Sequence, residues 1–258
     1  MNDALKSTLM AQMELARVFP RDMQEAIKKI NAICTSSQEV AESCFYCVVN
    51  EIDGKVIVGP SVRFAEIVAS CWGNMNIETR VASNDGRRIM VEARAHDLET
   101  NVSATVAIPK NIAGRTGKIA TNEAQTLASS ASCSVAYRNV LFKIVPASYF
   151  KSILENIKEK SLGDIKGLAS YRKKAMEYFT KKGVDKSLVF KALSVNKISD
   201  VDRAKLFELK GIRNSIEQGD TSIDELFYGK TGKRASTYSQ LDLETVIGEV
   251  EQESSPLS

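Results

Sequence analysis

The feature that most constrains the fold is a run of three segments, 76–83, 87–98 and 102–109, in which polar and apolar residues alternate. Short connections with Asn, Asp or Gly separate them, at 84–86 and 99–101. Successive side chains of a strand point to opposite faces, and connections of this kind favour tight turns between antiparallel strands. The sequence therefore predicts a three-stranded antiparallel meander.

The middle segment shows how the two faces of this sheet should differ. One face carries small or branched apolar side chains, namely Ile89, Val91, Ala93 and Ala95. The opposite face carries polar side chains and one methionine, namely Arg88, Met90, Glu92, Arg94 and His96. We expect the first face to lie in the core and the second to face water or a ligand.

A long segment of small residues follows the meander. A basic loop from Lys110 to Ile119 leads into it, and Thr121 or Asn122 is placed to cap a helix that runs to Val145. One face of that helix would contain Ala124, Leu127, Ala128, Ala131 and Val135. Since small side chains let a sheet approach closely, we predict an α+β fold, with an antiparallel β-meander and a hairpin packed on a long helix.

The hairpin and several helices precede the meander. Apolar residues recur at helical spacing in 3–19 and 22–34, which predicts two helices. The apolar run 44–58 contains Asp53-Gly54, a strong signal for a β-hairpin. Residues 61–72 then form a further helix, which their first residue, a serine, is suited to cap.

Beyond Pro146 the pattern becomes entirely helical. Glycines separate helical segments at 147–160, 168–182, 185–195 and 200–217, and 223–227 closes the series. We therefore expect three regions: an α+β core over 1–160, a helical module over 165–227 and an acidic tail over 228–258. The tail has few apolar clusters, which predicts that it is disordered.

Charge is distributed unevenly along the chain, whose net charge is +3. Residues 1–109 contain 11 basic and 14 acidic residues, and residues 218–258 contain three and eight. Residues 110–150 contain five basic residues and one acidic residue, and residues 151–217 contain 16 and nine. A basic middle between acidic ends favours an anionic partner.

Composition favours a soluble, cytoplasmic protein with reduced thiols. No run approaches the roughly 18 apolar residues that span a bilayer, and the N-terminus lacks the pattern of a signal peptide, so we expect no membrane partner. Of the five cysteines, Cys44 and Cys47 form an isolated CxxC pair in a strand-like run, and His96 is the only histidine. We expect no metal site, because four suitably spaced ligands are missing.

Two glycine-lysine loops resemble phosphate-binding loops but lack the required spacing. A P-loop at Gly117-Lys118 would need glycine at position 112 and serine or threonine at 119, and both positions hold isoleucine. Gly232-Lys233 fails similarly, with Phe227 and Arg234 at those positions. We therefore expect no ATP hydrolysis and no cofactor. No other catalytic motif occurs, so we expect that the protein is not an enzyme.

Basic side chains around the long helix are the candidate contacts for a polyanion. Lys110, Arg115 and Lys118 lie in the loop, Arg138 and Lys143 lie near the helix end beside Tyr137, and Arg80, Arg87, Arg88 and Arg94 lie on the meander. The loop and meander cations suit a solvated surface equally well, and cations at a helix C-terminus also offset the helix dipole. The tyrosine is either a stacking platform for bases or a core residue.

Three stretches carry a family resemblance: Gly59-Pro-Ser-Val-Arg-Phe-Ala-Glu66 with Trp72-Gly-Asn74, Glu92-Ala-Arg-Ala-His-Asp-Leu-Glu-Thr-Asn101, and Ala136-Tyr-Arg-Asn-Val-Leu-Phe-Lys-Ile-Val-Pro146. They resemble the phage-type single-strand annealing proteins, the RecT/Redβ/Erf-like recombinases. The order of a helix, antiparallel strands and a long helix is also similar to the core of these proteins. The resemblance covers residues 40–150 and the helical module that follows.

This resemblance implies an ATP-independent protein of DNA recombination and repair that forms homo-oligomeric rings or helical filaments. Single-stranded DNA would lie in a groove between the strands and the long helix, and an annealed duplex intermediate would be retained. In such proteins the basic end of the helix lines the groove, which points to Arg138 here. The module 165–227 would contact a partner exonuclease or a host single-strand-binding protein.

Two other hypotheses remain open. The positive charge of 151–217 also suits a regulatory protein that binds duplex nucleic acid through its C-terminal helices. The third hypothesis is an enzyme with a diffuse site, and the missing motifs argue against it.

Overall fold

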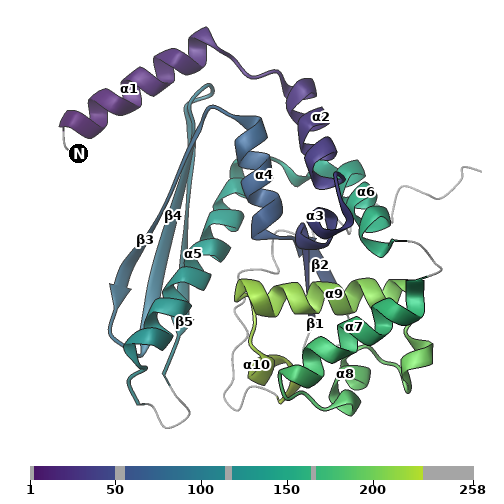
Figure 1. Cartoon of the computed structure of the whole chain (residues 1–258). Helices are drawn as coiled ribbons and strands as arrows, with labels where there is room; N and C mark the ends of the chain where they lie inside the picture. The colour runs from purple at the N-terminus through teal and green to yellow at the C-terminus, as the bar shows by residue number, and fades with distance from the viewer. Residues whose placement is uncertain (1–2, 50–55, 114–117, 164–166, 229–258) are drawn as a thin grey trace, which may run out of the picture.

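The computed structural model describes residues 3–49, 56–113, 118–163 and 167–228. Its elements, in chain order, are α1 (Asp3–Val18), α2 (Met23–Cys34), α3 (Gln38–Ser43), β1 (Phe45–Val49), β2 (Val56–Pro60), α4 (Val62–Trp72), β3 (Met75–Asn84), β4 (Arg88–Asp97), β5 (Val102–Asn111), α5 (Asn122–Ile144), the 3-10 helix η1 (Ala147–Phe150), α6 (Lys151–Leu162), α7 (Leu168–Lys181), α8 (Lys186–Ala192), the 3-10 helix η3 (Ile198–Asp200), α9 (Arg203–Gln218) and α10 (Ile223–Phe227). This arrangement confirms the predicted α+β fold class (Figure 1). The predicted Asp53-Gly54 turn and the acidic tail after Tyr228 lie outside the described residues.

Strands β3, β4 and β5 form the predicted antiparallel meander. The apolar residues of β4 are buried, whereas Arg88 and Arg94 are exposed on the opposite face, so the predicted division into two faces is confirmed. His96 is an exception, because it is buried and its Nε2 lies 2.9 Å from Asn101 Oδ1. The pairing of β3 with β4 shifts register between Val81 and Ser83.

Helix α5 covers the apolar face of this meander. The predicted cap is present, since the Thr121 side chain accepts the N–H of Ala124 at 3.3 Å. Ala136 and Val140 pack into the same apolar cluster as the core residues of β4. The predicted helix face was partly wrong, because Leu127 is 74% exposed. Helix α4 packs against α5 at its C-terminal half, and the N-terminal half of α5 extends beyond it along the sheet (Figure 1).

The other sheet is the hairpin of β1 and β2, which pair antiparallel. Helix α9 packs across it, and the rings of Phe45 and Phe207 stack with centroids 3.9 Å apart. Gly211 allows this approach, because a Cβ at that position would overlap Cys47 Sγ. The Ser215 hydroxyl donates to the Cys47 carbonyl at 2.5 Å. One apolar cluster therefore extends from the hairpin into the predicted helical module.

The cap of one further helix is as predicted, because Ser61 accepts the N–H of Phe64 at the start of α4. At the start of α2, Asp22 accepts the N–H of Glu25 in the same way. The short helix α3 was not predicted, because only six residues separate its caps and periodicity is weak over that length.

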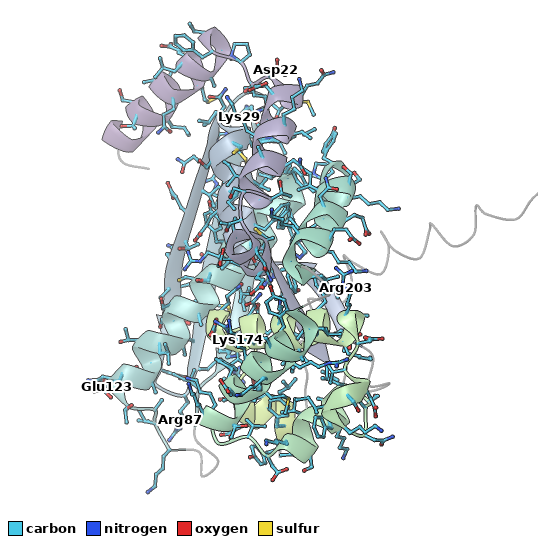
Figure 2. The ribbon with its side chains drawn as sticks, turned by 45° about the vertical axis from the view of Figure 1, so that its right-hand side comes forward. Asp22, Lys29, Arg87, Glu123, Lys174 and Arg203 are labelled. Atoms are coloured by element: carbon cyan, nitrogen blue, oxygen red, sulfur yellow. The ribbon has the colours of Figure 1, made fainter. Side chains whose placement is uncertain are left out.

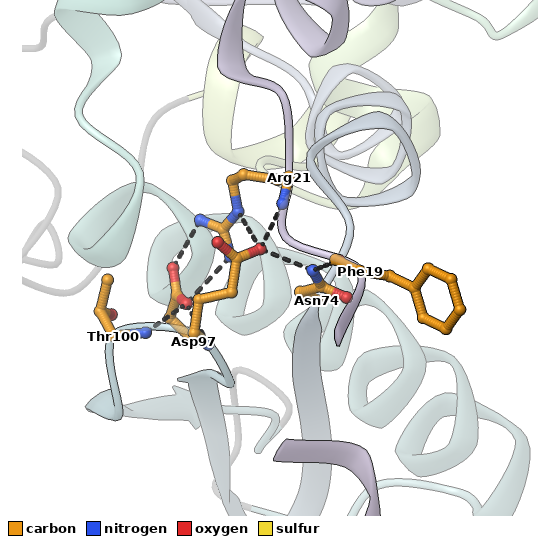
Figure 3. A network of polar contacts seen from close by, with 6 residues as sticks. Phe19, Arg21, Asn74, Asp97 and Thr100 are labelled. Carbon is orange, nitrogen blue, oxygen red and sulfur yellow. Dashed lines mark hydrogen bonds and ion pairs between the residues drawn. The ribbon is translucent and has the colours of Figure 1, made fainter. Parts of the chain in front are cut away.

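Arg21 ties the connection between α1 and α2 to the β4–β5 turn (Figure 3). Its guanidinium donates to both carboxylate oxygens of Asp97, at 2.6 and 2.9 Å. Its Nε and its backbone N–H both donate to Glu99 Oε1, at 3.1 and 2.9 Å. Asn74 donates to the same Glu99 oxygen at 2.5 Å. We call these four residues the closed end of the meander.

The closed end determines the charge of Asp97. Burial alone would raise the pKa of this carboxyl. Hydrogen bonds from Arg21 and from the backbone of Thr100 and Glu99, with the positive charge of Arg21, outweigh that effect and lower the pKa. Asp97 is therefore held as a carboxylate.

Helix α1 extends away from the other elements (Figure 1). It and the residue after it expose apolar side chains, namely Met10, Leu15, Val18 and Phe19. Among the described residues, no helix combines the length and the apolar character that crossing a bilayer would require.

Candidate nucleic-acid interface

Four of the predicted cations lie at one end of the meander, where the β3–β4 turn meets the loop between β5 and α5. We call them the sheet end: Arg87, Arg88, Lys110 and Lys118. In the ladder, Arg88 lies opposite Asn111 and Ile89 lies opposite Lys110. Because adjacent positions of a strand face opposite sides, Arg88 and Lys110 project from the two faces of the sheet.

Backbone hydrogen bonds hold both ends of the loop against the β3–β4 turn. The N–H groups of Ile112 and Ala113 donate to the Arg87 carbonyl at 2.8 and 3.0 Å, and the N–H of Ala120 donates to the Gly86 carbonyl at 2.8 Å. Gly86 has φ +76°, and a Cβ there would lie 2.6 Å from Ile119. A glycine is therefore needed for the close approach that brings Lys118 to this turn.

Two acidic residues lie near the sheet end. Asp85 Oδ1 accepts the N–H of Arg87 at 2.8 Å and of Arg88 at 2.6 Å. These backbone hydrogen bonds, first that of Arg88, lower the pKa of Asp85, so it is ionised. The second acid is Glu123 in the first turn of α5, and Figure 2 labels Arg87 and Glu123 at the same end of the molecule. The local charge is thus positive by a modest excess.

The other two cations of the meander lie on its outer face. Arg80 donates to Glu92 at 2.6 Å, and this pair is solvent-exposed. Arg94 lies opposite Glu78 on the neighbouring strand. These acids reduce the positive charge of the outer face, so Arg80 and Arg94 are secondary members of the candidate interface.

Arg138 is not at a surface, which contradicts its predicted contact with a DNA backbone. It is only 5% exposed, and its Nη1 donates to Asp220 Oδ1 at 2.8 Å. The guanidinium also lies 4.3 Å from the centroid of the Tyr46 ring. We call Arg138, Asp220 and Tyr46 the α5–α9 joint. A phosphate cannot reach this arginine unless the joint opens, so we remove Arg138 from the interface.

The joint also keeps Arg138 charged. Burial would lower the pKa of the guanidinium, but Tyr46 and Asp220 outweigh this effect and raise it. The other Asp220 oxygen, Oδ2, is buried without a hydrogen-bond partner. The pair therefore depends on its single strong contact.

The predicted groove between the strands and the long helix is filled. Ala136 and Val140 of α5 pack directly against the sheet and are fully buried. Tyr137 is half-buried against the main core, and burial raises its pKa. Phe150 and Trp72 also lie in the core, with ring centroids 6.2 Å apart. These aromatic residues stabilise the fold and do not form an open stacking platform.

The remaining predicted cations lie elsewhere. Lys143 is exposed in the last turn of α5. The 23 residues of this helix span about 35 Å at 1.5 Å per residue, so Lys143 is far from the sheet end. Arg115 lies outside the described residues. The candidate interface therefore consists of the sheet end with Arg80 and Arg94.

The described part of the chain contains all five cysteines. All five are free, and Cys34, Cys44 and Cys47 are buried. Burial raises the pKa of the Cys47 thiol, which keeps it protonated. No group of three or more His, Cys, Asp or Glu side chains that could hold a metal ion occurs among the described residues.

The closed end was missed at the sequence level. Its arginine lies 76 positions from Asp97, and the only available signal was a pair of acids, Asp97 and Glu99, at a turn. Such a pair does not reveal its partner.

The interface can hold phosphate groups by charge without reading bases, since its cations surround one sheet end and no shaped pocket is required. No family model, no curated protein and no solved structure matches the chain.

Proposed function

We propose that the protein is an ATP-independent single-stranded DNA-binding protein of homologous recombination that anneals complementary strands and is not an enzyme. The observation that carries the proposal is the sheet end. Its four cations are exposed or half-exposed, and none of them forms an ion pair with another described residue. The family resemblance of the sequence supports the same function.

The chemistry of these side chains suits contact with a DNA backbone. Arg87 and Arg88 can each donate two parallel hydrogen bonds to one phosphate, and Lys110 and Lys118 add point charges. Neutralising phosphates releases counterions, which gives affinity without sequence preference. A strand held by its backbone keeps its bases available for pairing, so base pairing selects the partner strand.

Self-assembly is part of this proposal. Helix α1 extends away from the body, and exposed apolar patches on a monomer commonly mark interaction sites. We expect a homo-oligomer in solution, and sedimentation velocity with and without residues 1–19 tests this. A monomer at every concentration would remove assembly from the proposal.

An annealing assay tests the central claim. Two complementary oligonucleotides with donor and acceptor dyes are mixed with the protein, without nucleotide, and duplex formation is followed by energy transfer. We expect annealing faster than the spontaneous rate. No acceleration at any ratio of protein to DNA would overturn the proposal.

Two variants with the same change in net charge test whether the sheet end is the DNA-binding site. The sheet-end variant combines Arg87→Gln, Arg88→Gln and Lys118→Gln. The control variant combines Lys28→Gln, Lys151→Gln and Lys160→Gln, three exposed lysines without an ion pair to another described residue. Only the sheet-end variant should bind single strands more weakly. Equal losses would show that net charge alone matters.

The alternative function makes a different prediction. A regulatory protein that binds duplex through its C-terminal helices would prefer duplex over single strands and would not accelerate annealing. The exposed lysines of α7 and α8 favour this alternative, and the same oligonucleotides distinguish the two functions.

A further inference from the structure

Helices α7 and α8 carry the largest set of exposed lysines in the described part of the chain. The segment 168–197 contains eight basic and two acidic residues. We call six of the lysines the lysine face: Lys173, Lys174, Lys181, Lys182, Lys186 and Lys191.

The way α7 packs determines which side chains are exposed. Met176 and Phe179 are buried in the main core. Positions 173 and 174 therefore lie on the solvent side of the helix, with positions 177 and 181 on the next turns of the same side. Tyr228 donates to the Gly183 carbonyl at 3.4 Å, and α10 packs near α8, so the connection between α7 and α8 is held to the module.

None of the six lysines forms an ion pair with another described residue. Lysines elsewhere in the described part do, for example Lys205 with Glu208 at 2.9 Å and Lys210 with Glu42 at 2.6 Å. The two acids of the segment reduce the excess without cancelling it. Glu177 is exposed on the same side of α7 as Lys173, Lys174 and Lys181, and it forms no ion pair with another described residue. Asp185 caps α8 by accepting the N–H and the hydroxyl of Ser187, at 2.7 and 2.6 Å.

The helix dipole does not explain this arrangement. Lys181 and Lys182 at the C-terminus of α7 do offset its dipole. Lys173 and Lys174 lie in the first half of that helix, and Lys186 is the first residue of α8, where a positive charge is unfavourable. Like charges this close repel one another within the Debye length of about 8 Å, so a bound polyanion would relieve the repulsion.

We propose that the lysine face is a second nucleic-acid site, separate from the sheet end, which binds the phosphate backbone. Lysine ammonium groups are point charges that contact phosphates without reading sequence. The one arginine of the segment is not available in the same way, because Arg172 donates to the carbonyls of Val201 and Ser199, at 2.6 and 3.1 Å. Figure 2 labels Lys174 on the helical module and Arg87 at the end of the meander that lies opposite the closed end. The inference does not depend on annealing activity.

The test compares three charge-matched variants of the full chain. The lysine-face variant combines Lys173→Gln, Lys174→Gln and Lys181→Gln, and the comparators are the sheet-end variant and the control variant defined above. Dissociation constants are measured by fluorescence anisotropy for a 30-nucleotide poly(dT) strand and for a 30-base-pair duplex, two probes of roughly equal length, across a salt series of about 50 to 200 mM. Unchanged melting temperatures verify the fold.

Loss of three phosphate contacts should reduce the slope of log affinity against log salt by about 2 to 3, and the affinity by at least about tenfold. We expect this for the lysine-face variant and not for the control variant. A loss of affinity for only one of these two probes also supports the site, and it identifies whether the site binds single-stranded or duplex DNA. Equal slopes for the two variants would overturn the inference. A loss seen only with polyglutamate, a third probe, would also overturn it, because the face would then recognise an acidic peptide.

Discussion

The two ends of the meander use arginine in opposite ways. At the closed end, Arg21 donates to Asp97 and Glu99, and its side chain is nearly buried. At the sheet end, Arg87 and Arg88 are exposed, and the nearby Asp85 accepts their backbone N–H groups. The first arginine holds two parts of the chain together, whereas the other two have donors available for a ligand.

Arg138 resembles Arg21, although its sequence surroundings resemble those of the sheet end. It lies in a basic stretch beside aromatic residues, yet its donor is used by Asp220. The comparison shows that a basic residue is a strong candidate contact when its side chain is exposed and its donors have no partner within the fold, as at the sheet end. The following predictions test this distinction.

The largest effect is expected at the α5–α9 joint. Arg138→Ala leaves Asp220 buried without its partner, and breaking a buried pair in this way costs about 3 to 5 kcal/mol. Urea denaturation measures the change in the free energy of unfolding. Asp220→Ala should cost a similar amount. Native stability with weakened DNA binding in Arg138→Ala would return this arginine to the interface.

The closed end should show a similar but smaller loss. Arg21→Ala removes three side-chain hydrogen bonds to two acidic residues, and we expect a cost of about 3 kcal/mol. The matched change at the other end, Arg88→Ala, should alter stability by less than about 0.5 kcal/mol, because its side chain is exposed. Equal losses of unfolding free energy in Arg21→Ala and Arg88→Ala would contradict the difference that we infer between the two ends of the meander.

Acid should weaken the closed end selectively. The pKa of Asp97 is lower in the folded protein than in the unfolded chain, where it is about 3.9. Its contribution to stability is therefore fully present above that value and is lost as the pH falls through the folded pKa. Urea midpoints between pH 7 and acid measure this loss. Asp97→Asn should be less stable at neutral pH and should flatten the acid dependence; an unchanged profile would contradict the role of Asp97.

The smallest effect on stability, and the clearest on binding, is expected at the sheet end. The double change Arg87→Gln and Arg88→Gln should leave the urea midpoint nearly unchanged. It should reduce the salt slope for single-stranded DNA by about 1.4, since each lost phosphate contact contributes about 0.7. Anisotropy titrations at several salt concentrations give the slope. A slope equal to that of the unmodified protein would exclude these two arginines.

Local patterns predicted much of the fold. Alternation of residue types identified the three strands and the buried face of β4, and Ser61 and Thr121 identified two helix starts. These features depend on neighbours a few positions apart. Periodicity also located α5. It did not show how much of the apolar side of this helix the sheet covers, and Leu127 on that side is exposed.

The site was less predictable, because its decisive partners are distant in sequence. Asp220 lies 82 positions from Arg138, and the sequence around either residue contains no pattern that predicts their ion pair. The sequence named the cations of the sheet end singly but not their common position, which depends on the backbone hydrogen bonds between the loop after β5 and the residues Gly86 and Arg87. Arg87, Arg88 and Lys118 are exposed, as is Lys143 in the last turn of α5, whereas Arg138 in the same helix is buried.

The contact between α9 and β1 has a consequence for synthesis on the ribosome. Ser215 meets the Cys47 carbonyl across 168 positions of sequence, and the ring of Phe207 covers Phe45. At a synthesis rate of about 5 to 20 residues per second, roughly 10 to 30 seconds pass between these segments. During that time the hairpin lacks its cover. The nascent chain thus leaves the side of the hairpin that α9 will cover exposed, and such an apolar surface is one that a chaperone can bind.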